Sequence, residues 1–143
     1  MASRVTPALL ALADGTIDCI ATDHAPHATS EKEGEYDHAA FGIVGLETAV
    51  SLVLDRLVRP GLIDLRTAVA RMSTDPARLL HLPGGSLAVG APADITLLDL
   101  ERELTVDPTR FLSKSRNTPF GGFRLRGAPV MTIVGGQIRW RAA

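Results

Sequence analysis

The stretch DGTIDCIATDHAPH, residues 14–27, decides the fold. The part from Ile17 to Thr22 is short and mostly apolar, and it is bounded by Gly15 and a polar cluster. This pattern predicts a buried strand of a parallel sheet. Asp23 follows at once, so its carboxylate is expected at the carboxyl end of that strand.

Asp23 and the two histidines after it form the densest chemical cluster in the sequence. Ligands of parallel α/β proteins bind at the carboxyl ends of strands, and an aspartate there can bind a divalent ion and accept a proton from metal-activated water. Pro26 stiffens the turn, so His27 would face the same mouth and could pair with an anionic substrate group. The pattern leaves open a second interpretation, in which Asp23 caps a turn and the imidazoles are ordinary loop residues.

Helices are predicted before and after this cluster. The apolar run Ala8–Ala13, closed by an Asp-Gly pair, favours a short helix over a signal peptide. Residues 24–41 are polar and are expected to form a long loop. Further helices are predicted over residues 43–59, from a cap at Asp64 through Arg71, and from Asp75 to Leu82.

The last third of the chain has the pattern of β structure. Short strands are predicted over residues 86–89, 94–100, 130–134 and 137–140, with Gly135-Gly136 as a hairpin turn. The change of pattern near residue 84 predicts two parts, an α/β part over residues 1–83 and a β-rich part over residues 84–143.

Composition narrows the class of protein. The 143 residues suffice for one small core, whereas a complete eight-stranded α/β barrel needs about 250. The net charge of -1 comes from scattered residues, so neither nucleic acid nor an anionic membrane is an expected partner, and no segment has transmembrane length. Cys19 is the only cysteine, which excludes an internal disulfide and fits a reducing compartment, by default the cytoplasm.

Residues 14–27 closely resemble the late barrel signature of dihydroorotases, which are metal-dependent cyclic amide hydrolases of the amidohydrolase superfamily. The resemblance extends from about Ala8 to Trp140, with one departure at Ala40, where the family usually has proline. The other matching segments are Glu31-Lys32 and residues 40–48, 74–78, 90–95 and 113–120.

The resemblance implies an α/β fold, namely the last strand and helices of a metal-dependent hydrolase TIM barrel followed by a small β-sandwich-type domain. It implies that Asp23 is a metal ligand and the general acid and base, that His27 binds the substrate carboxylate, and that the backbone of Phe41 and Gly42 contacts the substrate ring. One or two zinc ions would be the cofactor. The implied reaction is the reversible hydrolysis of dihydroorotate to N-carbamoyl-aspartate in pyrimidine biosynthesis.

Most of the machinery that this family needs is not in the sequence. No His-x-His pair is present, and one carboxylate is too few for a catalytic zinc, which usually has three protein ligands. The isolated chain is therefore expected to be inactive, as a carboxy-terminal piece that needs the missing part of a barrel. The start at Met1 is expected to correspond to an internal position of the complete family sequence. The other imidazoles are those of His24, His38 and His81, and His38 and His81 are expected to be solvated or to cap helices.

Two other functions stay open. Some dihydroorotase-like proteins are non-catalytic structural partners of aspartate carbamoyltransferase, although the presence of Asp23 and His27 argues against that role. A sister cyclic amidase, such as dihydropyrimidinase or allantoinase, shares the strand-end aspartate. His27 and the Phe41-Gly42 loop favour dihydroorotate as the substrate.

Overall fold

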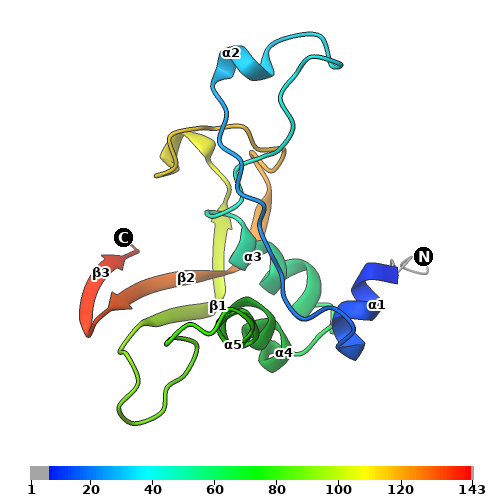
Figure 1. The fold of residues 1–143 in the computed structure, drawn as a ribbon. Helices are drawn as coiled ribbons and strands as arrows, with labels where there is room; N and C mark the ends of the chain where they lie inside the picture. Colours follow the sequence, from blue (N-terminus) through cyan, green and yellow to red (C-terminus); the bar gives the residue numbers. More distant parts are fainter. Residues whose placement is uncertain (1–6, 143) are drawn as a thin grey trace.

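A cluster of short helices packs beside a three-stranded antiparallel sheet, and a long arm, residues 23–44, extends away from them (Figure 1). The computed structural model describes residues 7–142. The helices are α1 (Pro7–Asp14), α2 (Thr29–Lys32), α3 (Ala49–Val53), η1 (Leu54–Val58), α4 (Leu65–Val69), η2 (Ala70–Thr74), α5 (Asp75–Leu79) and η3 (Pro108–Arg110), and the strands are β1 (Ile95–Thr105), β2 (Arg124–Val134) and β3 (Gln137–Arg141).

The helices predicted from Asp64 form one continuous run, because α4, η2 and α5 follow one another without a break. Asp64 caps the run as predicted, since its Oδ1 accepts a 2.7 Å hydrogen bond from the Thr67 amide. Pro76 does not begin a separate helix, because proline is tolerated in the first turn of α5 while η2 supplies a wider turn before it.

His81 ends this run in the left-handed conformation, with a φ of 53°. Its amide donates to the carbonyl of Arg78 at 3.3 Å, and the amide of Leu82 donates to the carbonyl of Ala77 at 2.8 Å. These two bonds form a Schellman motif, which satisfies carbonyl groups at the helix end. The side chain of His81 is exposed, and the bonds at this helix end are made by backbone groups alone.

The sheet has the order β1-β2-β3, and its strands are longer than predicted at two places. β1 extends beyond residue 100 and β2 begins six residues before residue 130, whereas β3 and the hairpin turn at Gly135-Gly136 agree with the prediction. Gly127 and Pro129 interrupt the apolar pattern of β2, which explains why its first half was not predicted.

A close contact joins the sheet to the helices. Gly127 in β2 has a φ of 99°, and a Cβ atom added to it would lie 2.8 Å from the Cβ of Leu54 in η1. The amide of Arg126 also donates to Asp55 Oδ1 at 3.0 Å. Glycine therefore allows β2 to approach the helix at a distance that no other residue permits.

The prediction of a strand from Ile17 to Thr22 is wrong. The segment is extended, but a strand needs a hydrogen-bonded neighbour, and the amide of Ile20 instead donates to the carbonyl of Arg71 in η2, in the middle of the helical run. Ile17 and Ile20 nevertheless pack against the buried cluster of Leu12, Val53, Ile63 and Ala68, so the segment is part of the core.

Three further predictions differ from the structure. The helix expected from residue 43 begins at Ala49, because the backbone of residues 43–45 bonds to other segments, and residues 86–89 form no strand. The β-sandwich expected after residue 84 is not formed by residues 7–142, which contain a single sheet, whereas a sandwich needs two. The domain boundary near residue 84 stays a prediction.

Membrane insertion was not expected from the sequence. Within residues 7–142, no helix combines the length and the apolar content that crossing a bilayer requires.

Candidate functional site

The arm (residues 23–44) brings two of the predicted site segments side by side. A parallel β-bridge pairs His24 with Ile43, and the amide of Ala25 donates to the carbonyl of Ile43 at 2.9 Å. The imidazole Nδ1 of His24 accepts a 3.1 Å hydrogen bond from the amide of Gly45. His24 therefore closes the base of the arm through its side chain and its backbone.

Gly42 lies where only glycine fits. Its φ is 101°, and a Cβ atom there would lie 2.4 Å from the Cβ of Ala25 and 3.8 Å from Nε2 of His27. The backbone of Gly42 and the imidazole of His27 are thus neighbours, although 14 residues separate them in the sequence. The structure brings together two residues that were predicted to bind substrate.

The imidazole of His27 is oriented by its surroundings. Its Nδ1 lies 3.7 Å from Glu31 Oε2, the side chain is 25% exposed, and Nε2 faces Gly42. The backbone of His27 is held as well, because its carbonyl accepts from the Ser115 hydroxyl. One ring nitrogen is therefore turned toward a carboxylate and the other toward the Phe41-Gly42 segment.

Asp23 is exposed and adopts the left-handed conformation, with a φ of 46°. Aspartate tolerates this conformation better than most residues. Its carboxylate has no hydrogen-bond partner among residues 7–142. Asp23 therefore does not cap a turn in this part of the chain. Both carboxylate oxygens are available to bind a ligand.

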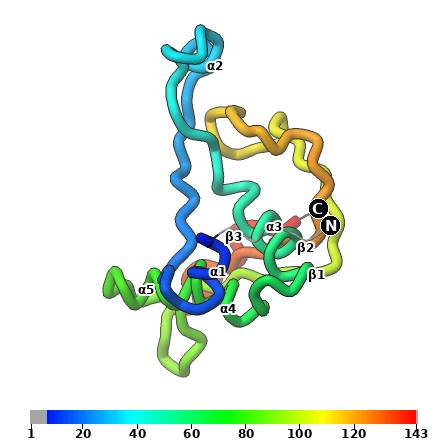
Figure 2. Tube along the Cα trace, turned by 90° about the vertical axis from the view of Figure 1, so that its right-hand side faces the viewer, coloured from blue at the N-terminus to red at the C-terminus, as the bar shows by residue number. Residues whose placement is uncertain are grey.

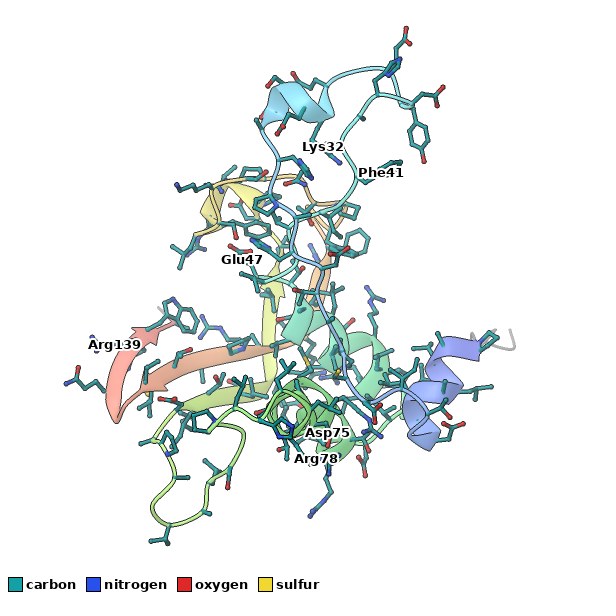
Figure 3. All side chains as sticks on the ribbon, in the orientation of Figure 1. Lys32, Phe41, Glu47, Asp75, Arg78 and Arg139 are labelled. Atoms are coloured by element: carbon teal, nitrogen blue, oxygen red, sulfur yellow. The ribbon has the colours of Figure 1, made fainter. Side chains whose placement is uncertain are left out.

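Phe41 lies on the arm with its side chain 88% exposed. Lys32 reaches from α2 toward the same segment, as Figure 3 shows, and its Nζ donates to the carbonyls of Ala40 and Gly42 at 2.6 and 3.1 Å. The amide of Ala40 donates to the carbonyl of Glu31 at 3.0 Å, a bond that proline could not form. Hydrogen bonds therefore hold the loop where the family usually has proline.

Glu47 supports the base of the arm from a position two residues before α3. Its Oε1 accepts a 2.8 Å bond from the amide of Ser113, while Oε2 is buried without a partner in the described chain. Burial raises the pKa of the Glu47 carboxyl, but the Ser113 hydrogen bonds and the nearby His24 outweigh it and hold the pKa below its ordinary value. Glu47 is therefore a carboxylate at neutral pH.

The described residues do not by themselves make up a metal centre. Within residues 7–142, no three histidine, cysteine, aspartate or glutamate side chains lie close enough together to hold an ion. A catalytic zinc usually has three protein ligands, and the free carboxylate of Asp23 fits the role of one. The other ligands would have to come from outside these residues.

Asn117 is the residue of the site that the sequence did not reveal. The loop between β1 and β2, residues 106–123, lies beside the base of the arm in both views (Figures 1 and 2). From this loop Asn117 Nδ2 donates to the carbonyls of Ala25 and Gly42, at 3.0 and 3.1 Å. Residues 113–120 resemble the matching segment of dihydroorotases, but nothing in that segment indicates which residues the Asn117 amide bonds to.

Comparisons with known proteins agree with this arrangement. The model of the amidohydrolase family matches residues 1–139. A dihydroorotase from Pelotomaculum thermopropionicum is 58% identical over 127 residues, which are 89% of this chain and 30% of the relative. A dihydroorotase from Halalkalibacterium halodurans is 52% identical over 129 residues, which are 90% of this chain and 30% of the relative. The resemblance to dihydroorotases is confirmed.

Solved structures of related hydrolases have the same fold over this region. The L-hydantoinase (dihydropyrimidinase) from Arthrobacter aurescens superposes with a TM-score of 0.85 at 34% identity, over 92% of this chain and 30% of that one. The dihydropyrimidinase from Brevibacillus agri gives 0.87 at 26% identity, over 94% and 30%. The chain thus spans about 30% of the length of the relatives it matches. The family model matches residues 1–139 of the 143 residues, and the chain therefore belongs to the amidohydrolase family.

Proposed function

We propose that this chain supplies part of the substrate site of a dihydroorotase, which hydrolyses the cyclic amide of dihydroorotate to N-carbamoyl-aspartate and runs the reverse condensation in pyrimidine biosynthesis. The observation that carries the proposal is that the Gly42 backbone lies next to His27, since a Cβ atom added to Gly42 would be 3.8 Å from Nε2 of His27. A backbone edge beside an imidazole suits a small planar ring that bears a carboxylate.

The substrate would use groups that have no partner among the described residues. The N–H groups of Phe41 and Gly42 form no hydrogen bond within residues 7–142, so they are free to donate to ring carbonyls. His27, placed between Glu31 and Gly42, would bind the substrate carboxylate.

Asp23 would provide one metal ligand and would move the proton. One or two zinc ions would supply an activated water, and Asp23 would take the proton from the nucleophile and return it to the leaving ring nitrogen. Because Asp23 is the one metal ligand proposed among residues 7–142, the remaining ligands would have to come from another part of the protein or from a partner. We expect the isolated chain to be inactive and the complete protein to work in the cytoplasm.

A sister cyclic amidase is the second candidate. The solved structures that match this chain are named dihydropyrimidinase or hydantoinase, and these act on other cyclic amides. The dihydroorotases match at higher identity, 52–58% against 26–34% for these structures, which favours dihydroorotate. A non-catalytic role beside aspartate carbamoyltransferase would need neither Asp23 nor His27.

The test begins with the native protein, captured from its source through a tag placed after Ala143. We expect an assembly or chain well above 15.2 kDa that contains zinc and opens dihydroorotate in preference to dihydrouracil and allantoin. Preference for one of the other two rings would favour the sister amidase. A zinc-free protein that opens no ring and copurifies with aspartate carbamoyltransferase would overturn the catalytic proposal.

A further inference from the structure

Asn117 is the point at which both sides of the arm meet the β1–β2 loop. Its Nδ2 group donates to Ala25 on one side and to Gly42 on the other. Its Oδ1 accepts from the amide of His27 at 3.4 Å, and its backbone carbonyl accepts from Val44 at 3.0 Å. One residue thus bonds to the segment that carries Asp23 and His27 and to the segment that carries Phe41 and Gly42.

The surroundings of Asn117 fix which way its amide points. Two carbonyl oxygens face one end and need donors, while a backbone N–H faces the other end and needs an acceptor. A flipped amide would set its oxygen against both carbonyls. Both Nδ2 hydrogens are therefore used, and no side chain other than an asparagine offers two donors and an acceptor at this length.

The carbonyl of Gly42 is held from two directions. Asn117 Nδ2 donates to it at 3.1 Å, and Lys32 Nζ donates to it at 3.1 Å from the other segment of the arm. A carbonyl oxygen has two lone pairs, so both are occupied. The peptide group between Gly42 and Ile43 cannot rotate without breaking these bonds, which holds the Gly42 backbone beside the His27 imidazole.

We propose that Asn117 is a positioning residue, which sets the separation between the His27 imidazole and the Phe41-Gly42 backbone by bonding to the Ala25 and Gly42 carbonyls. The inference rests on the function proposed above, because the two groups it holds are those that would bind a small anionic ring. Asn117 itself touches no substrate. Its effect is on how tightly the substrate is bound, through the spacing of groups on two different loops.

The first test compares Asn117→Asp with Asn117→Ala in the 143-residue chain. Aspartate has the same shape but loses both donors and turns a carboxylate oxygen toward two carbonyls. Hydrogen exchange at the Ala25 amide, which bonds across the arm to Ile43, should therefore speed up about tenfold or more in both variants. Exchange at the Leu52 amide in the helix should not change.

Thr118→Val is the matched control, since it removes a local bond to the Phe120 amide in the same loop and touches neither side of the arm. If Asn117 only filled space, the isosteric aspartate would exchange like the wild type, and the inference would be overturned. Asn117 is the only asparagine in the sequence, so selective ¹⁵N labelling gives one side-chain amide signal. Free exchange of that signal in the unmodified chain would overturn the inference without any variant.

The second test uses the native protein that contains the chain, with dihydroorotate as the probe. Asn117→Asp should raise KM about tenfold, while kcat stays within about threefold and bound zinc is unchanged, because uniform substrate binding is what the spacing supports. A fall in kcat with unchanged KM would overturn the positioning role. If the wild type opens no ring, the proposed function fails, and the exchange measurement alone decides whether Asn117 holds the arm.

Discussion

Arg71 Nη1 lies 2.8 Å from Asp75 Oδ2, one helical turn away, and the two side chains are only 16% and 9% exposed. The carbonyl of the same arginine accepts from the amide of Ile20 at 2.9 Å. This pair therefore joins the helical run to the extended segment that leads to Asp23. The segment has no strand partner in the described chain, so Arg71 does part of what a neighbouring strand would do.

Asp75→Ala should destabilise the chain by about 3 kcal/mol, because it leaves the largely buried guanidinium of Arg71 without its partner. Unfolding in urea, followed by circular dichroism, measures the loss. Arg78→Ala is the control, since the Arg78 side chain is 72% exposed and its ion pair with Asp75 should contribute no more than about 1 kcal/mol. Equal losses of unfolding free energy in the two variants would contradict the stabilising role of the buried Arg71–Asp75 pair.

Gly127→Ala should cost roughly 2–4 kcal/mol, because it adds a left-handed alanine and a contact of 2.8 Å with Leu54. Gly136→Ala separates the two effects. It has a φ of 76° but meets nothing closer than 3.9 Å, so it carries the backbone strain alone. Thermal unfolding of both variants should show the larger fall in melting temperature for Gly127→Ala.

His81→Gly should stabilise the chain by about 1 kcal/mol, because glycine adopts the φ of 53° without the strain that a side chain brings. The Schellman bonds are between backbone groups and stay in place. Denaturant titration checks this, with His81→Asn expected between the two. A destabilised glycine variant would mean that the imidazole itself stabilises the helix end.

Glu47 should make stability depend on pH in the acid range. Its pKa is lowered in the folded chain, so the stabilisation is complete above the ordinary value of 4.5 and is lost as pH falls through the lowered value. The melting temperatures of the wild type and Glu47→Gln should therefore differ at neutral pH and converge in acid. A difference that persists unchanged at low pH would rule out the carboxylate as its cause.

Asp23→Asn tests the proposed metal ligand without disturbing the backbone, because asparagine also tolerates a φ of 46°. In the native protein we expect loss of bound zinc and a fall in ring opening of about 10²-fold or more. Asp18→Asn, five residues earlier and also exposed, is the control and should leave both unchanged. Full zinc content in the Asp23 variant would contradict the role of the carboxylate as a ligand.

Sequence patterns predicted what depends on neighbouring residues. The cap at Asp64, the end of α1 near Gly15 and the hairpin at Gly135-Gly136 each follow from a few adjacent side chains, and the structure has all three. The Ile17–Thr22 strand failed because a strand is defined by its neighbour, which local patterns do not reveal. The start of α3 was misplaced for the same reason, since residues 43–45 bond to His24 and Asn117 instead.

The site divides in the same way. Asp23, His27, Phe41 and Gly42 were predicted from motifs, and the structure brings His27 and Gly42 together, while the roles of all four in binding and catalysis stay predictions. Asn117 was assigned no function, because nothing in its own segment indicates that its partners lie in another. Only the folded backbone relates the two loops to it.

The hydrogen bond between Asn117 and Ala25 joins residues 92 positions apart. During synthesis the His27 segment is made first, and at ribosomal speed its partner follows on the order of ten seconds later. For that time the carbonyls of Ala25 and Gly42 can bond only to water or to Lys32. The helices around Leu12 and Val53 can already pack, so the arm is expected to become ordered last and to be the part of the nascent chain most open to proteases.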